Sequence, residues 1–138
     1  MGYVFLGRVL ALLVLLVLTT SCSQSTSGVT SSGPQSPCDR SSSIKGSIAS
    51  ISSASSGRLV GSFLLDGSKE KQAAYDQVYV QVPSSTQVYE KQASGCQTVP
   101  FTALKKGQRV QIQSTGIATQ SDPPRIEAAE ILLLAPQT

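Results

Sequence analysis

Histidine, tryptophan and asparagine are absent from this chain of 138 residues. Without histidine there is no imidazole to act as base or ligand near neutral pH, which excludes Ser-His-Asp hydrolysis, Cys-His proteolysis and the usual catalytic zinc sites. The sequence also has no glycine-rich phosphate loop, no calcium-loop pattern and no cluster of oxygen ligands. We therefore predict no catalytic residues, no metal site and no cofactor.

Charge is scarce as well. The formal net charge is +3, the chain has no basic block, and one of its 11 basic side chains, Arg8, lies in a segment that we predict to be cleaved. A charge so small and so dispersed gives little attraction for a phosphate backbone. Nucleic acid is therefore not the expected partner.

The chain has a single long apolar run, VLALLVLLVL over residues 9–18, which follows Arg8. At about 1.5 Å per residue, this run is too short to cross roughly 30 Å of bilayer hydrocarbon. A positive residue, a short apolar core and small residues at its end are typical of a secretory signal peptide. We predict that residues 1–21 are such a peptide and that the protein is exported.

The end of this run, LTTSC over residues 18–22, resembles the lipobox of bacterial lipoproteins, although that family prefers Leu at the position of Thr19. The resemblance implies that the Cys22 thiol carries diacylglycerol and anchors the protein to a bacterial membrane, at the cell surface or in the periplasm. Two acyl chains hold a protein where one slips off. The alternative is an ordinary signal peptide that leaves Cys22 as a stray thiol.

Residues 22–37 are rich in Ser, Gly and Pro, and they contain no charge, no aromatic side chain and one branched aliphatic, Val29. Such a segment buries too little apolar surface to offset the entropy lost on ordering. We predict a disordered linker with a reach of roughly 20 Å, which holds a folded domain off the membrane.

From Cys38 onward, apolar residues recur with the period of two that is typical of β-strands. Strands are predicted at 44–51, 58–65, 77–82, 87–89, 109–114 and 125–134. A helical turn ending at Gly107 separates the first four from the last two. This order predicts a mainly β domain over 38–136, a small antiparallel barrel of five to six strands like the OB-fold.

The last predicted strand has apolar residues on both faces, which indicates burial on both sides near its end or a β-bulge that changes face. It also carries Glu127 and Glu130. Residues three apart on a regular strand point to opposite faces. We therefore expect two separate surface carboxylates rather than a general acid and base.

Cys38 and Cys96 are the cysteines that remain once Cys22 is assigned to the anchor. A disulfide between them suits a small exported domain and closes a long loop, which is worth roughly 4 kcal/mol on the chain-entropy model. The alternative is two free thiols. Neither cysteine lies in a C-x-x-C motif, so redox catalysis is not expected.

Three short stretches, IKGSI (44–48), ALKKGQRVQI (103–112) and SDPPRIEAAEILL (121–133), resemble the YobA-like exported domains of unknown function. The resemblance implies an OB-like barrel with a glycine in its first strand and a proline-containing loop before its last strand. It implies no activity.

OB-folds bind oligosaccharides and oligonucleotides, so outward-facing aromatic and basic residues are candidate ligand contacts. The candidates are Tyr79, Tyr89, Arg58 and Arg109, with Tyr75 and Lys45 as further possibilities. The alternative is that these side chains cover the barrel and bind nothing. Lys105 and Lys106 are expected only to solvate a turn.

These observations predict a lipid-anchored, non-catalytic binding or accessory module of the bacterial cell envelope. Its partner is expected to be an envelope protein, for example through addition of a strand to a free sheet edge, or an envelope polysaccharide. The alternatives are an OB-fold that binds oligosaccharide or nucleic acid, and an enzyme that works without histidine.

Overall fold

The computed structural model describes residues 33–54 and 57–136, and every structural statement below concerns these residues. The predicted signal peptide, the lipidation of Cys22 and most of the predicted linker lie outside the described residues. Two short 3-10 turns and seven strands make up the described chain. They are η1 Pro37–Asp39, β1 Ile44–Ser53, β2 Leu59–Asp66, β3 Gln77–Pro83, β4 Gln87–Gln92, β5 Gly95–Val99, η2 Phe101–Ala103, β6 Arg109–Ser114 and β7 Arg125–Leu133.

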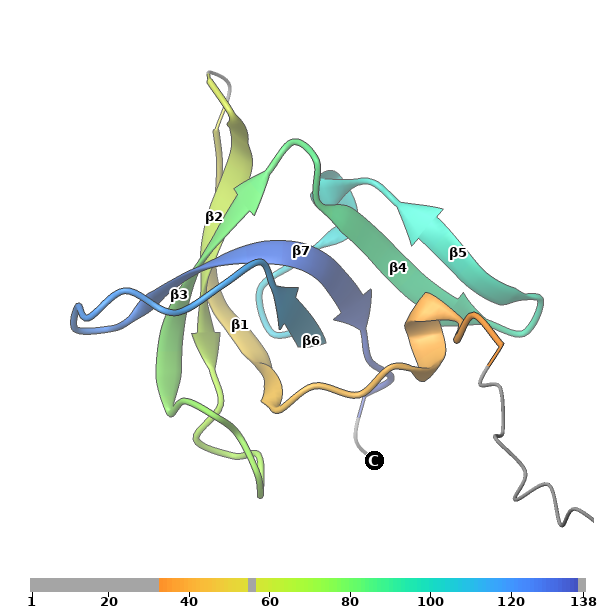
Figure 1. Cartoon of the computed structure of the whole chain (residues 1–138), viewed down its shortest axis with the longest axis horizontal. Coiled ribbons are helices and arrows are strands. Elements are labelled where there is room, and N and C mark those ends of the chain that lie inside the picture. Colours follow the sequence, from red (N-terminus) through yellow and green to blue (C-terminus); the bar gives the residue numbers. More distant parts are fainter. Residues whose placement is uncertain (1–32, 55–56, 137–138) are drawn as a thin grey trace, which may run out of the picture. The chain divides into compact units, whose positions relative to one another are not determined.

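The strands form one sheet that closes into a barrel (Figure 1). Its order is β3-β2-β1-β6-β7-β4-β5, and β3 also pairs with β7, so that β1, β2, β3, β6 and β7 complete the ring. A three-strand meander, a crossover and two further strands are the OB-like order, which confirms the predicted fold class. Two details differ, because there are seven strands in all and β7 pairs parallel with both β3 and β4.

The barrel core follows from strict alternation along the strands. In β3, Val78, Val80 and Val82 are buried, while Tyr79 and Gln81 between them face outward. Large apolar side chains from all five barrel strands fill the interior. The fully buried ones are Phe63, Ile48, Leu65, Ile112, Ile131, Val78, Val80, Val82 and Val110.

β7 contains a β-bulge, one of the two alternatives that its sequence allowed. Gln113 of β6 pairs with Glu130 while Ser114 pairs with Ala128, so Ala129 is the extra residue. The bulge shifts the alternation by one, and Glu127 and Glu130 therefore both lie on the outer face. The expectation that these two carboxylates face opposite sides was wrong for this reason.

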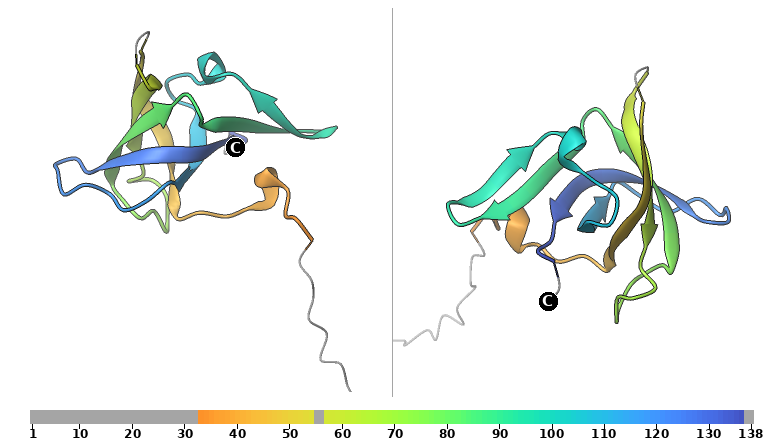
Figure 2. Two further views of the ribbon diagram at one scale, coloured as in Figure 1. Left: turned by 45° about the horizontal axis from the view of Figure 1, so that its top comes forward. Right: turned by 180° about the vertical axis from the view of Figure 1, so that it is seen from behind.

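A segment that we call the strap, residues 37–43, crosses the outer face of β6 and β7 beside the β4–β5 hairpin (Figure 2). Cys38 forms the predicted disulfide with Cys96 of β5, with a Cα–Cα distance of 5.7 Å and a sequence separation of 58. Gln111 Nε2 donates a hydrogen bond of 2.6 Å to the Arg40 carbonyl, and Arg40 forms an ion pair of 2.7 Å with Glu130. The strap thus covers the outer face of β6 at Gln111, while the inner face of the same strand lies in the core.

The crossover between β3 and β6 differs most from the prediction. The short strand expected at 87–89 extends to Gln92 and forms a hairpin with β5, which had no predicted counterpart. The helical turn is present as η2, and Gly107 closes the following turn with a φ of +86°. A left-handed φ is accessible to glycine at little cost, which explains the residue at this position.

All described strands, the core and the disulfide lie within one compact unit, Pro34–Thr138. A segment that contains its own core and its own covalent staple has what independent folding requires. This unit is therefore suited to experiments on the isolated domain.

Candidate ligand-binding surface

Five outward side chains from three adjacent strands form a polar patch that we call the Tyr79 face. It comprises Ser62 of β2, Tyr79 and Gln81 of β3, and Arg125 and Glu127 of β7. The register brings them together, because Tyr79 pairs with Arg125 and Gln81 pairs with Glu127 across the parallel β3–β7 ladder. The closure of the barrel therefore creates this patch.

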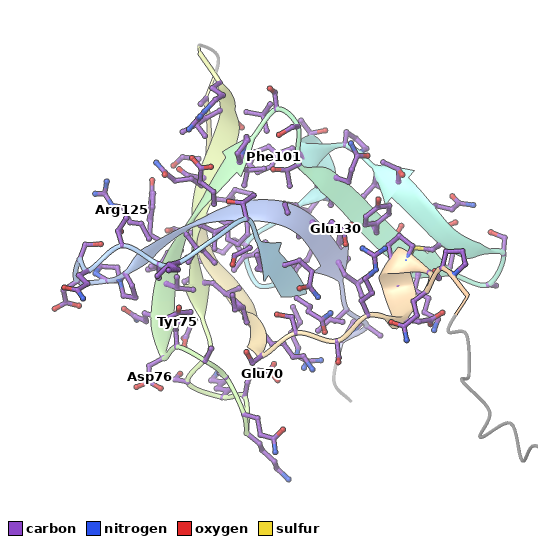
Figure 3. All side chains as sticks on the ribbon, viewed as in Figure 1. Glu70, Tyr75, Asp76, Phe101, Arg125 and Glu130 are labelled. Atoms are coloured by element: carbon purple, nitrogen blue, oxygen red, sulfur yellow. A yellow bond between two sulfur atoms is a disulfide. The ribbon has the colours of Figure 1, made fainter. Side chains whose placement is uncertain are left out.

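Tyr79 is held in place from both sides of β3. Its hydroxyl group shares a hydrogen bond of 2.7 Å with Ser62 Oγ on β2. From β7, the Arg125 guanidinium lies over its ring, 5.5 Å from the ring centroid. Figure 3 shows Arg125 near the start of β7, well separated from Glu130 further along the same strand. The fixed ring and the planar guanidinium together present a rigid surface.

Arg58 also lies on this side of the barrel. Its guanidinium nitrogen Nη2 is 2.8 Å from Glu127 Oε1, and its side chain is 77 % exposed. Glu127 retains its second carboxylate oxygen, which can accept hydrogen bonds from a ligand. Two of the four predicted ligand contacts, Tyr79 and Arg58, are thus brought to one surface.

A cleft of about 480 Å³ opens beside the Tyr79 face, under the loop that joins β6 to β7. Polar groups from this loop and from the face line it. The lining residues are Gln81, Thr115, Gly116, Ile117, Thr119, Ser121, Arg125, Ile126 and Glu127. Ile117 is 99 % exposed at its rim. The cleft therefore combines hydroxyl, amide, carboxylate and guanidinium groups with one free aliphatic side chain.

Arg109 is placed away from the Tyr79 face, against the loop between β2 and β3. It donates two hydrogen bonds to the Glu70 carboxylate, Nε–Oε1 at 2.8 Å and Nη2–Oε2 at 3.0 Å, and the side chains are only 19 % and 15 % exposed. The hydrogen bonds from Arg109 hold the pKa of Glu70 below its ordinary value. The geometry gives Arg109 a structural partner, and the structure does not bring it to a ligand surface with Arg58.

Tyr89 is also distant from Tyr79, although both lie along the same edge of β7. Their pairing partners in β7 are Leu132 and Arg125, so the two tyrosines are separated by roughly 20 Å along the strand. Stacked bases of a single strand need aromatic rings at much closer spacing. The two tyrosines therefore do not form one stacking platform.

A second and larger cleft, of about 870 Å³, lies where the β4–β5 hairpin, the turn before β6 and the end of β7 meet. We call it the Lys105 cleft. It is lined by three lysines, Lys91, Lys105 and Lys106, and part of its wall is formed by Leu132–Leu134. The sequence assigned Lys105 and Lys106 only to a solvated turn, and nothing local indicated that the turn borders a cleft.

The described residues contain no group of three or more Cys, Asp or Glu side chains placed to hold a metal ion. Among the carboxyls, Asp66 accepts hydrogen bonds from the hydroxyl and backbone N–H of Ser68, at 2.6 and 3.0 Å, and its pKa is lowered as a result. No helix in the described part of the chain is long and apolar enough to cross a bilayer.

The Tyr79 face shows which functional candidates the sequence could supply. Gln81 follows from the alternation around Tyr79, and Arg125 and Glu127 alternate around Ile126 in the same way. They meet Tyr79 only because β3 and β7 pair in parallel, which places Arg125 beside Tyr79 although 46 residues separate them in the sequence. No local pattern encodes this pairing. Comparison with known proteins adds no assignment, since no family model, no curated protein and no solved structure matches this chain.

Proposed function

We propose that this protein is an exported, non-catalytic binding module, anchored to a bacterial membrane by lipid on Cys22, whose OB-like domain binds an envelope polysaccharide on the Tyr79 face. The likeness of residues 18–22 to a lipobox supports the anchor. The disulfide between Cys38 and Cys96 is compatible with an oxidising compartment. The resemblance to YobA-like exported domains agrees with this location.

The observation that carries the proposal is the polar character of the Tyr79 face and its adjoining cleft. Sugar rings present many hydroxyl groups, each of which both donates and accepts hydrogen bonds, and the face offers both functions at Gln81, Arg125 and Glu127. Their positions are fixed by the paired strands β3 and β7, so little ordering entropy is lost on binding. An oligosaccharide is therefore the ligand class that this surface fits best.

The charge of the Tyr79 face favours polysaccharide binding over nucleic-acid binding. A single-strand binder needs a positive groove and successive exposed rings. On the Tyr79 face Glu127 offsets the charge of Arg58, and Arg125 covers the one aromatic ring. The surface is thus better suited to a neutral, hydroxyl-rich polymer than to a phosphate backbone.

The non-catalytic part of the proposal also has support. Glu127 and Glu130 share a face but are directed to different partners, Arg58 and Arg40. Asp66 and Glu70 have lowered pKa values, whereas a general acid at neutral pH needs a raised one. A binding role requires neither a convergent carboxylate pair nor a proton donor.

Co-sedimentation with insoluble cell-wall polysaccharide tests this proposal. Residues 34–138 in their oxidised form are expected to pellet with purified wall material. Glu127→Gln replaces an acceptor oxygen by a donor and Gln81→Ala removes an amide, so each is expected to weaken the affinity about 5- to 30-fold, the equivalent of about 1–2 kcal/mol. Gln97→Ala is the matched control, because Gln97 is an exposed amide on β5, away from the face. Equal binding by all variants, or no binding at all, would refute the polysaccharide assignment.

A protein partner is the second candidate, and the sheet edge favours it. β5 ends the strand order, and among the described residues no strand pairs with its other side. It contains no charged residue and no proline, which are common protections of an exposed edge. An extended segment of an envelope protein could add there by backbone hydrogen bonding.

Cross-linking in intact cells, followed by mass spectrometry, separates the two candidates. Strand addition predicts one dominant captured protein, lost in Thr98→Pro and in the unanchored Cys22→Ala variant. Thr98 lies within β5, where proline removes a backbone donor. Capture unchanged by Thr98→Pro would contradict the strand-addition candidate.

A further inference from the structure

The Lys105 cleft combines positive charge with an aliphatic wall, and none of its lining residues belongs to the proposed polysaccharide site. Lys105 and Lys106 lie at the tip of the turn that Gly107 closes, and Lys91 projects from the β4–β5 hairpin. Across from these lysines runs the end of β7, with Leu132–Leu134 followed by Ala135 and Pro136. Positive and apolar groups thus border the same open space.

The lysines differ in whether they form an ion pair with a carboxylate. Lys91 Nζ is 3.0 Å from Asp39 Oδ1 in an exposed ion pair. Arg109, which also borders the cleft, is bound by Glu70. Lys105 and Lys106 have no ion pair among the described residues. Glu90 also lines the cleft and keeps its negative charge, because its hydrogen bond of 2.9 Å comes from the neutral Gln92 amide. The turn therefore contributes two positive charges that form no ion pair, and they outnumber the one free carboxylate on the cleft.

The wall of the cleft provides the apolar half of a binding site. Leu132 is largely buried at 7 % exposure, and Leu133 and Leu134 are half-buried. A ligand with an anionic head and an aliphatic body would satisfy both halves at once. Anionic phospholipids have this chemistry, whereas a free phosphate or a neutral glycan would leave one half unused.

The position of the cleft agrees with a membrane ligand. Cys38 lines the cleft, and the described chain starts at Gly33, only a few residues earlier. The segment that leads toward Cys22 therefore joins the domain at this cleft. We infer that the Lys105 cleft docks the headgroup of an anionic phospholipid. This inference rests on the proposed lipid anchor, because a flexible tether with a reach of roughly 20 Å lets the domain contact the bilayer.

Vesicle co-sedimentation tests this inference with residues 34–138, which lack Cys22 and the apolar run. Each lysine near an anionic surface contributes an attraction large enough for the Lys105→Gln/Lys106→Gln variant to bind about 30-fold more weakly than the parent. The expected result is binding to vesicles of 70 % phosphatidylcholine and 30 % phosphatidylglycerol, little binding to pure phosphatidylcholine, and weakening by salt.

The chain offers a matched control in Lys69→Gln/Lys71→Gln, which removes the same charge from the loop between β2 and β3. This control is expected to keep vesicle binding within about twofold of the parent if the cleft, rather than net charge, is responsible. Leu134→Ser is expected to weaken binding severalfold without changing its salt dependence, because it removes only apolar contact.

Three results would overturn the inference: equal loss in the two lysine variants, equal binding to both vesicle types, or no vesicle binding. Inorganic phosphate that competes fully at millimolar concentration would also contradict a lipid ligand and indicate a simple anion site. Because the tested segment has no anchor, each of these failures leaves lipidation of Cys22 and polysaccharide binding to be judged by their own experiments.

Discussion

At the scale of single residues, Gly46 shows how tightly the barrel is closed. It lies in β1, and a Cβ atom at this position would collide with the backbone of Asp66 and Gly67. Backbone atoms cannot give way as the end of a flexible side chain can. The glycine within the IKGSI stretch thus has a packing reason, independent of any resemblance.

We predict that Gly46→Ala lowers the free energy of unfolding by about 1–3 kcal/mol through overpacking. Gly116→Ala is the control, because nothing lies within 4 Å of a Cβ at Gly116. Urea unfolding followed by tyrosine fluorescence measures both. A Gly46→Ala protein as stable as the parent would mean that β1 and β2 pack less closely than described.

Arg109 and Glu70 give a second prediction at this scale, concerning pH. Glu70 has a lowered pKa in the folded state, so its charged form stabilises the fold above the unfolded-state pKa near 4.5. That stability is lost as pH falls through the lower folded-state pKa. We expect Glu70→Gln to cost about 1–3 kcal/mol at pH 7 and to cost progressively less below pH 4.5.

Thermal unfolding of both proteins between pH 2.5 and pH 7 measures this difference. Arg109→Gln should show the same convergence at low pH, because either substitution breaks the same pair. A Glu70→Gln penalty that stays constant from pH 7 to pH 2.5 would show that the ion pair contributes nothing to stability.

At the scale of elements, the strap depends on its covalent attachment to β5. The Cys38–Cys96 disulfide closes a loop with a sequence separation of 58, and the ion pairs of Asp39 and Arg40 are exposed and weak by comparison. We predict that Cys38→Ser/Cys96→Ser lowers the free energy of unfolding by roughly 4 kcal/mol. The strap should also become the first segment to open.

Limited trypsin digestion, together with urea unfolding, checks this prediction. Cleavage after Arg40, two residues from Cys38, should accelerate in the double variant far more than cleavage after Lys69. Lys69 lies in the loop between β2 and β3, far along the chain from both cysteines. Unchanged cleavage at Arg40 would show that the polar contacts alone fix the strap.

At this scale, the sequence predicted some strands well and missed others. Alternation located β1, β2, β3, β6 and β7 to within two residues at each end, because each has one face in the core. β5 was missed because four of its five residues are polar or small and no apolar alternation marks it. The bulge at Ala129 stayed undecided, since apolar residues on both faces of β7 fit either a bulge or burial on both sides.

The candidate site was less predictable than the fold. Tyr79 and Arg58 were found from local patterns, but their neighbours Arg125 and Glu127 reach them only through barrel closure. The ion pair of Arg109 could not be predicted, because its partner Glu70 lies 39 residues away on a loop without a periodic pattern. Local periodicity predicts which face a side chain occupies, and long-range pairing decides what it meets there.

At the scale of the whole molecule, the proposed lipid anchor on Cys22 is followed along the chain by a domain with two distinct surfaces. The Tyr79 face is polar and nearly charge-balanced, whereas the Lys105 cleft is positive and partly aliphatic. A module that contacts the membrane through one surface and the wall through the other would connect the two. This arrangement requires that Cys22 carry lipid.

We therefore predict that cells expressing the full chain incorporate radiolabelled fatty acid into this protein, and that Cys22→Ala abolishes the label. Cys38→Ser/Cys96→Ser should keep it, since those thiols form the domain disulfide. The parent should partition into the detergent phase, because two acyl chains give stable anchoring. Label retained by Cys22→Ala would contradict the anchor.

NMR titration of ¹⁵N-labelled residues 34–138 with soluble cell-wall oligosaccharides shows whether the Tyr79 face is a ligand-binding surface. We predict that the largest backbone shifts gather at Tyr79, Gln81, Glu127 and the 115–124 loop, and that Glu127→Gln moves the titration midpoint to an oligosaccharide concentration about 5- to 30-fold higher. Shifts centred on β5, or none at saturating oligosaccharide, would contradict it.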